Sequence, residues 1–400
     1  MRFVAAASLL VVLLLLFGCS QQPPASPAQQ PGQAAQQPPQ APPQSVQPPA
    51  QQPQPANVSP PTGNVVNNSP ANATPVQPGQ QPPALPNETA QVEEEEPIIA
   101  PIGVSLYKGF WMPCMFLENS CQSMSDVSRL KDVGANVVAL GPTVKINAQG
   151  EVKMDVSMDV AEQRLAELAK YYYGQNISIA ISIETMYVNS FNDQTPAGGP
   201  GAFPSSAVSK PGFLDKYNQL VEQFANLSEK YHVAIFSPMN EPDMKLGASK
   251  ASEWGQQVLP LVKKYYSGKV LYKAGNLAAS PQLDFRGYDI IGIDTTPGGG
   301  GPQGGLNAYP ALLDKVLADS LAWAKRDGVP EVMFTEFGVW GAAVSWNEND
   351  KATAHELVFE AGKGKVTGFF VLDPPPDLDR PITGTKSLEV VKEWFTQGLD

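Results

Sequence analysis

After residue 97 the chain alternates short apolar runs with amphipathic stretches, and this alternation restricts the fold more than any other feature. The apolar runs number eight, at 102–107, 136–141, 177–184, 233–240, 269–276, 289–294, 331–338 and 366–373. They are apolar throughout rather than at every second residue, which is typical of parallel strands buried on both faces. The stretches between them have the period of helices, and several end at glycine, where helices commonly stop.

Eight strand and helix units predict a (β/α)8 TIM barrel, an α/β fold, over residues 98–400. A doubly wound open sheet is the alternative. In a TIM barrel the C-terminal ends of all strands meet at one edge, the barrel mouth, and active sites lie there. Residues at the ends of the apolar runs are therefore the first candidates for a functional site.

The N-terminus has the pattern of a secretory signal peptide over residues 1–18. Met1 and Arg2 precede an apolar run over 3–17, which is short for a membrane-spanning helix, and Gly18 and Cys19 follow. The end of the run, LLFGCS, resembles the lipobox of bacterial lipoproteins, which implies cleavage before Cys19 and lipidation of its thiol. An uncleaved N-terminal anchor is the alternative. Both place the rest of the chain outside the cytoplasm, at the cell surface or in the periplasm.

Residues 19–97 are predicted to be a disordered, lipid-anchored stalk. Between 20 and 97 lie 21 of the 40 prolines and many glutamines, but no aromatic residue, lysine or arginine. Such a segment cannot bury enough apolar surface to form a core, and proline favours an extended chain. We therefore expect the barrel to be tethered to the membrane at a distance.

Two glutamates occupy the ends of predicted strands. Glu241 follows the fourth apolar run in the sequence NEP, and Glu336 lies near the end of the seventh, in FTEF. Both should face the barrel mouth. A carboxylate next to a buried core is costly to desolvate unless it is partnered, so two of them suggest catalysis more than stability. Salt bridges at the barrel rim are the alternative.

This arrangement resembles the clan of retaining glycoside hydrolases with (β/α)8 barrels, which includes many cellulases, β-mannanases and β-galactanases. In that clan an Asn-Glu pair ends strand four and a second Glu ends strand seven. The resemblance implies that Glu241 is the general acid/base, that Glu336 is the nucleophile, and that Asn240 hydrogen-bonds the sugar 2-hydroxyl. It implies hydrolysis of a β-linked polysaccharide or oligosaccharide by double displacement.

No metal and no cofactor is needed for such a reaction. The chain departs from common members of the clan at the ends of strands two, six and eight, where it reads LGPTV, DTTPGGGG and FFVLDPPP. These departures leave a second hypothesis open, a non-catalytic barrel that binds glycans at the cell surface.

Further side chains near strand ends are candidates for substrate contacts. Acidic residues that end strands could bind sugar hydroxyls, with rim salt bridges as the alternative: Glu184, Asp294 and Asp373. Aromatic residues in the predicted loops could stack on the C–H face of a sugar, with loop packing as the alternative: Trp111, Tyr187, Trp340 and Trp346.

Other chemistries are poorly supplied. The chain has only two histidines, His232 before strand four and His355 in the helix after strand seven, and we interpret both as structural. This argues against a Ser-His-Asp triad and a His-rich metal site. A net charge of -12 without a basic cluster argues against nucleic acid as a partner. We expect a monomer.

One of the three cysteines, Cys19, directly follows the predicted signal peptide, and the other two lie in the predicted barrel domain. If Cys19 is lipidated, Cys114 and Cys121 remain as a pair in an oxidising compartment, and we expect a disulfide between them. The loop that it closes would brace the segment after strand one. Two buried free thiols are the alternative.

Overall fold

The computed structural model describes residues 100–101, 103–113, 124–192, 203–275, 283–297, 305–339, 346–374 and 382–399. These residues belong to one compact unit, Thr89–Asp400. Several predictions lie outside the described residues: the signal peptide, the stalk, Cys19, the Cys114–Cys121 disulfide and Trp340.

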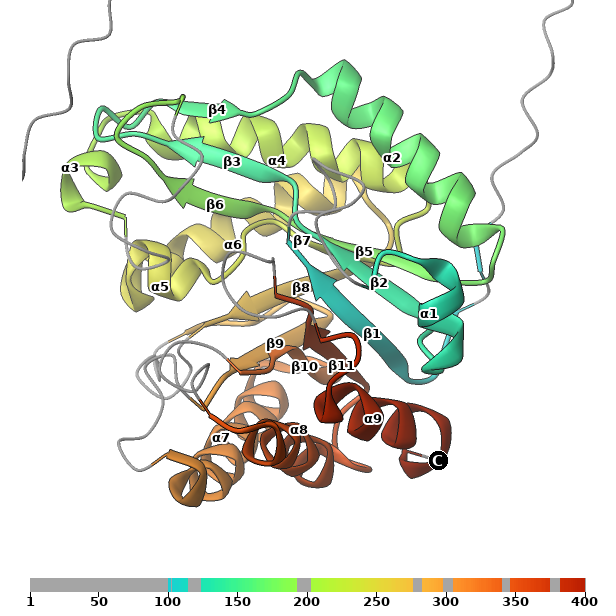
Figure 1. Cartoon of the computed structure of the whole chain (residues 1–400). Helices are drawn as coiled ribbons and strands as arrows, with labels where there is room; N and C mark the ends of the chain where they lie inside the picture. Colours follow the sequence, from blue (N-terminus) through green and yellow to red (C-terminus); the bar gives the residue numbers. More distant parts are fainter. Residues whose placement is uncertain are drawn as a thin grey trace, which may run out of the picture. The chain divides into compact units, whose positions relative to one another are not determined.

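Parallel strands form a closed barrel in the order β1-β11-β10-β9-β8-β7-β5-β2 (Figure 1). In chain order these strands are β1 (Tyr107–Met112), β2 (Val137–Leu140), β5 (Ser178–Ser182), β7 (Ile235–Ser237), β8 (Lys269–Ala274), β9 (Ile290–Thr295), β10 (Glu331–Phe337) and β11 (Gly368–Leu372). The predicted (β/α)8 TIM barrel is confirmed. The open sheet is wrong, because β1 pairs with β11 and closes the ring.

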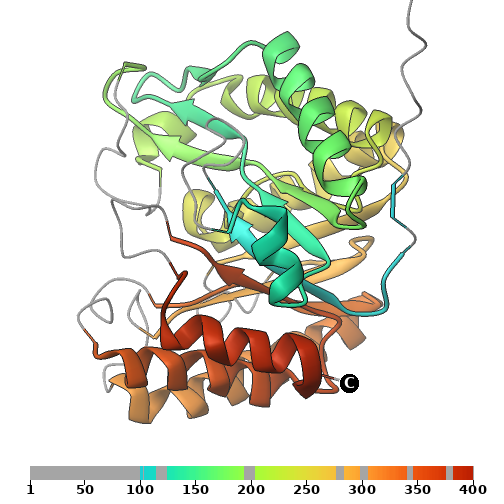
Figure 2. The same ribbon diagram turned by 45° about the vertical axis from the view of Figure 1, so that its right-hand side comes forward.

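Helices cover the outside of the barrel. They are α1 (Val127–Asp132), α2 (Met158–Tyr173), α3 (Ser205–Val208), α4 (Phe213–Lys230), α5 (Pro242–Leu246), α6 (Ala248–Tyr265), α7 (Tyr309–Asp327), α8 (Glu348–Gly362) and α9 (Lys386–Glu393), with a 3-10 turn η2 (Gly305–Ala308) and a π-helical turn η4 (Trp394–Gly398). Figure 2 shows α7, α8 and α9, in orange to red, as one layer beside the last strands. Among the described residues no helix is both long and apolar enough to cross a bilayer.

Local sequence signals fix where several helices begin. The Asn347 side chain accepts hydrogen bonds from the N–H groups of Asn349 and Asp350 at the start of α8. The hydroxyl of Thr385 accepts from the N–H of Leu388 at the start of α9. Such caps satisfy N–H groups that have no partner within the helix.

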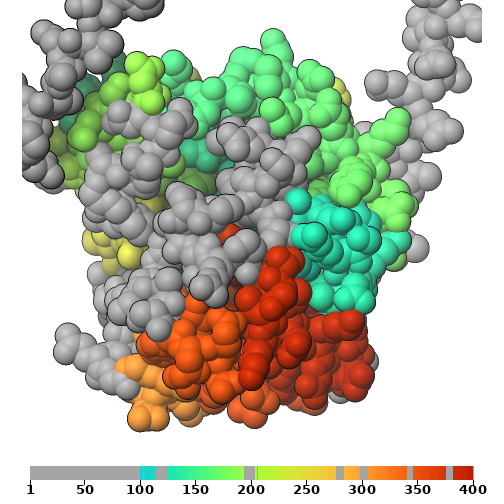
Figure 3. All heavy atoms as spheres, viewed as in Figure 1, coloured from blue at the N-terminus to red at the C-terminus, as the bar shows by residue number. Residues whose placement is uncertain are grey.

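The first and last helices of the barrel meet. Figure 3 shows the turquoise surface of α1 against the red surface of the C-terminal segment. Nζ of Lys392 in α9 lies 2.8 Å from Oδ1 of Asp132 in α1, and the ring of Phe395, after α9, packs edge to face on the ring of Phe110 in β1. These contacts close the helical layer as β1 and β11 close the sheet.

Side chains of the strands alternate between two apolar clusters. The inner cluster fills the barrel and includes Tyr107, Trp111, Leu271, Ile290 and Met333. The outer cluster lies between strands and helices and contains the alternate residues of the strands, whose side chains point away from the barrel interior. The spacing of a residue from a member of the inner cluster therefore tells whether its side chain faces the barrel interior.

The predicted position of the first strand is wrong. The strand is Tyr107–Met112 rather than the apolar run 102–107, although it contains Lys108 and Gly109. Lys108 points outward, where Nζ donates to the carbonyl of Phe395 over 2.7 Å. Gly109 is needed for close approach, because a Cβ there would lie 2.4 Å from the carbonyl oxygen of Val137.

Two further features differ from the sequence interpretation. The stretch 280–287, one of those between apolar runs that were expected to be helical, contains no helix in its described part, 283–287. A second, three-stranded sheet of β3 (Thr143–Ile146), β4 (Val152–Met154) and β6 (Glu184–Tyr187) was not predicted. Its strand β3 follows β2 and its strand β6 follows β5, so this sheet extends the barrel wall at the mouth.

Candidate active site

Lys273 and Asp294 continue the inward-facing rows of β8 and β9. Leu271 and Ile290 belong to the inner cluster, and side chains alternate along a strand, so Lys273 and Asp294 point into the barrel near its mouth. The side chain of Lys273 is 1% exposed and that of Asp294 is 5% exposed. The sequence interpretation missed Lys273. Its signal was a lysine at an inward position of an otherwise apolar strand.

A bulge in β10 turns Glu336 into the barrel. The register of β10 shifts between Phe334 and Glu336 against β9, and between Phe334 and Phe337 against β11. Phe334 and Phe337 both pack in the outer cluster although they are three residues apart, which a regular strand does not allow. The extra residue lets Thr335 and Glu336 both face inward. Oγ1 of Thr335 donates to Oδ1 of Asp294 over 2.7 Å.

Asn240 and Glu241 follow β7 at a bend in the backbone. Glu241 directly precedes α5 with φ 51° and ψ 54°, the left-handed region that residues with a Cβ seldom occupy. Its N–H donates to the carbonyl of Lys273 over 3.1 Å, and Asn240 forms an isolated parallel bridge with Lys273. Backbone strain of this kind clusters at functional sites, which favours a functional role for Glu241.

Gly275 leaves room for the Glu241 carboxyl group. A Cβ at residue 275 would lie 2.5 Å from Oε1 and 2.6 Å from Cδ of Glu241. The N–H of Gly275 donates to Oδ1 of Asp243 over 2.9 Å, which fastens the end of β8 to α5. A larger side chain at 275 would therefore displace the carboxyl group of Glu241.

Lys273 joins the carboxylates of the sixth and seventh barrel strands. Its Nζ donates to Oε2 of Glu336 over 2.7 Å and also forms an ion pair with Oδ2 of Asp294. The ring of Trp111 covers the ammonium group, with its centroid 4.8 Å from Nζ. The Glu336 side chain is 17% exposed, so it is the carboxylate of the two that is more open to a ligand.

The two central glutamates differ in their electrostatic surroundings. Burial, and after it the negative charge of Glu336, raise the pKa of Glu241 to about 7, although Lys273 and Lys245 oppose the change. Burial disfavours the ammonium form of Lys273, but Asp294, Glu336 and Glu241 more than offset this and raise the pKa of that lysine. Lys273 therefore stays charged beside Glu336, while Glu241 is partly protonated at neutral pH.

Glu184 holds Asn240 in place. Nδ2 of Asn240 donates to Oε2 of Glu184 over 2.7 Å, and Nζ of Lys245 lies 3.9 Å from Oε1. Burial raises the pKa of Glu184, and the nearby lysine opposes the shift. Oδ1 of Asn240 is buried and has no hydrogen-bond partner among the described residues. The pairing with Glu184 thus leaves Oδ1 as an acceptor for a ligand.

The other described residues that were predicted to contact substrate are buried, hydrogen-bonded or packed within the protein. Trp111 lies in β1 rather than in a loop, and it is 1% exposed. Asp373 is fully buried, and its Oδ2 accepts the N–H of Met124 over 2.8 Å, which fastens the segment before α1 to the end of β11. Tyr187 ends β6 and Trp346 precedes α8, and both pack against the outer cluster.

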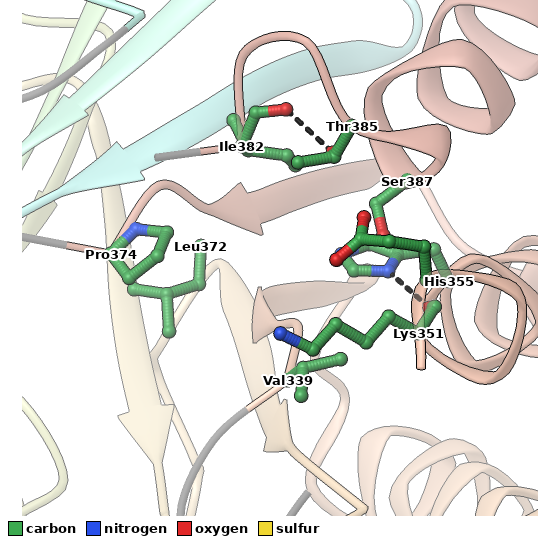
Figure 4. Close-up of a pocket in the computed structure, with 9 residues that line it drawn as sticks. Val339, Lys351, His355, Leu372, Pro374, Ile382, Thr385 and Ser387 are labelled. Atoms are coloured by element: carbon green, nitrogen blue, oxygen red, sulfur yellow. Dashed lines mark hydrogen bonds between the residues drawn. The ribbon is translucent and has the colours of Figure 1, made fainter. Parts of the chain in front are cut away.

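His355 lines a cavity of about 30 Å³ between α8, the start of α9 and the end of β11 (Figure 4). Nδ1 of His355 lies 2.9 Å from the carbonyl oxygen of Lys351, and burial lowers the pKa of the imidazole. A cavity of this size accommodates water but no sugar ring. His232 is exposed in the turn between α4 and β7, away from the barrel mouth. Both positions agree with structural roles.

In the ranges that the structure describes, no group of three His, Cys, Asp or Glu side chains is arranged to hold a metal ion. The cluster at the mouth instead brings together Glu241, Glu336, Asn240, Asp294 and Lys273. Glu184 is attached to it through Asn240. Such a cluster can donate a proton from one carboxyl group and present a second carboxyl group, paired with an ammonium group, to a ligand.

No protein-family model and no curated protein matches the sequence. Solved structures do match in fold. A GH113 β-1,4-mannanase is 16% identical with a TM-score of 0.53, over 74% of this chain and 100% of that one. The GH113 β-mannanase from Alicyclobacillus acidocaldarius, in complex with ManMIm, is 14% identical with a TM-score of 0.53, over 73% and 98%. A glycoside hydrolase family 5 enzyme from Prevotella bryantii is 13% identical with a TM-score of 0.50, over 73% and 96%. At these identities the likeness shows a common TIM-barrel fold.

Proposed function

We propose that the chain is a retaining glycoside hydrolase that cleaves a β-linked polysaccharide or oligosaccharide by double displacement. The observation that carries this proposal is that two carboxyl groups at one barrel mouth have different surroundings. Glu241 has a pKa raised to about 7. Glu336 is held by the ammonium group of Lys273. A general acid must hold a proton, which the raised pKa of Glu241 supports, and the ammonium group of Lys273 lies where it can balance the charge of a nucleophilic carboxylate.

In the first step Glu336 attacks the anomeric carbon while Glu241 donates its proton to the leaving oxygen. A glycosyl-enzyme ester forms on Glu336, and the glycosidic bond breaks. In the second step Glu241, now a carboxylate, takes a proton from water as the water attacks the ester. Sugar is released with retained configuration, and both carboxyl groups return to their starting states.

Asn240 is suited to bind the sugar next to the reacting bond. Its Oδ1 is buried without a partner among the described residues, so a hydroxyl that donates to it would relieve an unsatisfied acceptor. Because Asn240 directly precedes Glu241, this hydroxyl would lie beside the acid. The 2-hydroxyl of the bound sugar meets this requirement.

Product analysis on β-mannan, β-galactan, β-glucan and xylan tests the proposal. One of the similar structures is a β-1,4-mannanase and another is a β-mannanase, so β-mannan is the first polymer to test. We expect cleavage of at least one polymer, with the β-anomer as the first product seen by proton NMR. The Glu241→Gln, Glu336→Gln double variant controls for contaminating activity. A protein that binds these glycans but cleaves none would be a binding barrel, and the proposal would be withdrawn.

We propose further that this enzyme acts at the outer face of a membrane, tethered by lipid on Cys19 and by the Pro/Gln-rich segment over 19–97. The support is the apolar run followed by LLFGCS and the lack of aromatic and basic residues in that segment. Two acyl chains hold a protein on a membrane stably. The mass of the mature N-terminal peptide tests this, since an unmodified peptide that begins at Met1 contradicts the anchor.

A further inference from the structure

Lys273 is a lysine enclosed at the base of the candidate site. It comes from the fifth barrel strand, β8, and its side chain is only 1% exposed. Lysine is almost never buried to this extent unless it is paired. Here the ammonium group contacts Glu336 on β10, Asp294 on β9 and the ring of Trp111 on β1. Three other barrel strands, β1, β9 and β10, therefore fix its position.

We propose that Lys273 is the positioning residue for the nucleophile: its ammonium group holds Oε2 of Glu336, so that Oε1 is presented to the anomeric carbon. This inference rests on the proposed hydrolase function. It gives Lys273 no contact with substrate, because the side chain is enclosed and its ammonium group is already bound to two carboxylates. Asp294, predicted from the sequence to bind sugar, is assigned instead to anchoring Lys273.

Asp294, the carboxylate that anchors Lys273, is itself held in place. Oδ1 of Asp294 accepts from Oγ1 of Thr335 over 2.7 Å, while Oδ2 pairs with Lys273. Thr335 faces inward by regular alternation from Met333, and the bulge in β10 turns Glu336 inward as well. Gly292 makes room for this bond, since a Cβ there would lie 2.4 Å from Oγ1 of Thr335. Adjacent residues of β10 thus place the nucleophile, Glu336, and fix Asp294 through Thr335.

The charge on Lys273 also acts on the acid. It lowers the pKa of Glu241, against burial and against the charge of Glu336, which raise it. The charged groups that act on Glu241 come from four elements and are Glu336 on β10, Lys273 on β8, Lys245 on α5 and Glu184 on β6. Without Lys273 the pKa of Glu241 rises further. The fall in activity that follows loss of the proton from Glu241, called the alkaline limb of the pH profile, therefore moves to higher pH.

The same strand offers a matched control at the opposite end of the barrel. Lys269 is the first residue of β8, and its Nζ lies 2.6 Å from Oε1 of Glu331 on β10 and 5.1 Å from the ring centroid of Tyr107 on β1. Lys269 therefore repeats the partners of Lys273, a glutamate of β10 and an aromatic ring of β1, away from the barrel mouth. Lys269→Met removes the same charge from the same strand.

The test compares Lys273→Met, Lys273→Arg and Lys269→Met in the full chain, on a substrate that the parent cleaves. We expect Lys273→Met to lower kcat by about 100-fold with little change in KM, because misplacement of a reacting group by about 1 Å has this effect. Its alkaline limb should move to higher pH. Lys273→Arg should have a higher kcat than Lys273→Met, and its alkaline limb should lie at the same pH as that of the parent. Lys269→Met should change neither quantity.

Each outcome decides the proposal. A folded Lys273→Met variant with the kcat and pH profile of the parent overturns the positioning role alone, whereas a parent that cleaves nothing overturns the hydrolase proposal and this one with it. Circular dichroism and thermal unfolding establish that the variants are folded. If Lys273→Met does not fold, Lys273→Gln keeps a hydrogen-bond donor without the charge. It should show the same shift of the alkaline limb, and an unshifted limb contradicts the proposal.

Discussion

Alanine in place of Glu336 is expected to lower the hydrolysis of every substrate of this protein by at least ~10⁴-fold. The variant lacks the group that forms the glycosyl-enzyme, and the neighbouring carboxylate of Asp294 is already bound to Lys273 and Thr335. The loss should appear in kcat and should not depend on the leaving group. Rates on the natural glycan and on an aryl glycoside measure it.

Azide separates loss of the nucleophile from loss of the fold. A small anion can enter the space left by the Glu336 carboxylate and attack the anomeric carbon directly, so Glu336→Ala should form a glycosyl azide of inverted configuration. Glu331→Ala, at the other end of β10, is the control. It breaks the ion pair with Lys269 and should leave kcat near that of the parent. Activity of Glu336→Ala close to that of the parent would rule out this nucleophile.

The sequence was sufficient for most of the barrel because its strands are short and apolar throughout. Seven of the eight runs lie on observed barrel strands, from 136–141 onward. The first failed for a physical reason. Run 102–107 is more apolar than Tyr107–Met112, but Lys108 reaches the carbonyl of Phe395 and Gly109 allows close contact with β2. Tertiary contacts, rather than hydrophobicity, decide where β1 begins.

The candidate site was predicted in part. The positions of Glu241 and Glu336 follow from counting strands, because every strand of a parallel barrel ends at the same mouth. The roles of Lys273, Asp294 and Glu184 do not follow from counting. They depend on which side chains pair across neighbouring strands and on a bulge that changes the parity of β10. Strand pairing and a local bulge are properties of the folded chain, which a pattern of single residues does not reveal.

Glu241 is expected to give the protein an alkaline limb near pH 7. Its pKa is raised to about 7, and a general acid works only while it is protonated, so kcat/KM should fall as the pH rises through this value. Glu241→Ala should lower the cleavage of natural glycans by about 10²–10⁴-fold. An aryl glycoside with an acidic phenol needs no proton on its leaving oxygen. For this substrate the first step should survive, and the alkaline limb should disappear.

The same residue can be tested without removing it. Gly275→Ala places a methyl group 2.5 Å from Oε1 of Glu241 and should displace the acid, which lowers the cleavage of natural glycans more than that of the aryl glycoside. Gly103→Ala is the control, because its Cβ meets nothing within 4 Å.

Azide should rescue Glu241→Ala with retained configuration, since it replaces water on the glycosyl-enzyme, whereas Glu336→Ala gives inversion. Inverted product from both variants would contradict the assignment of Glu241 as the acid/base.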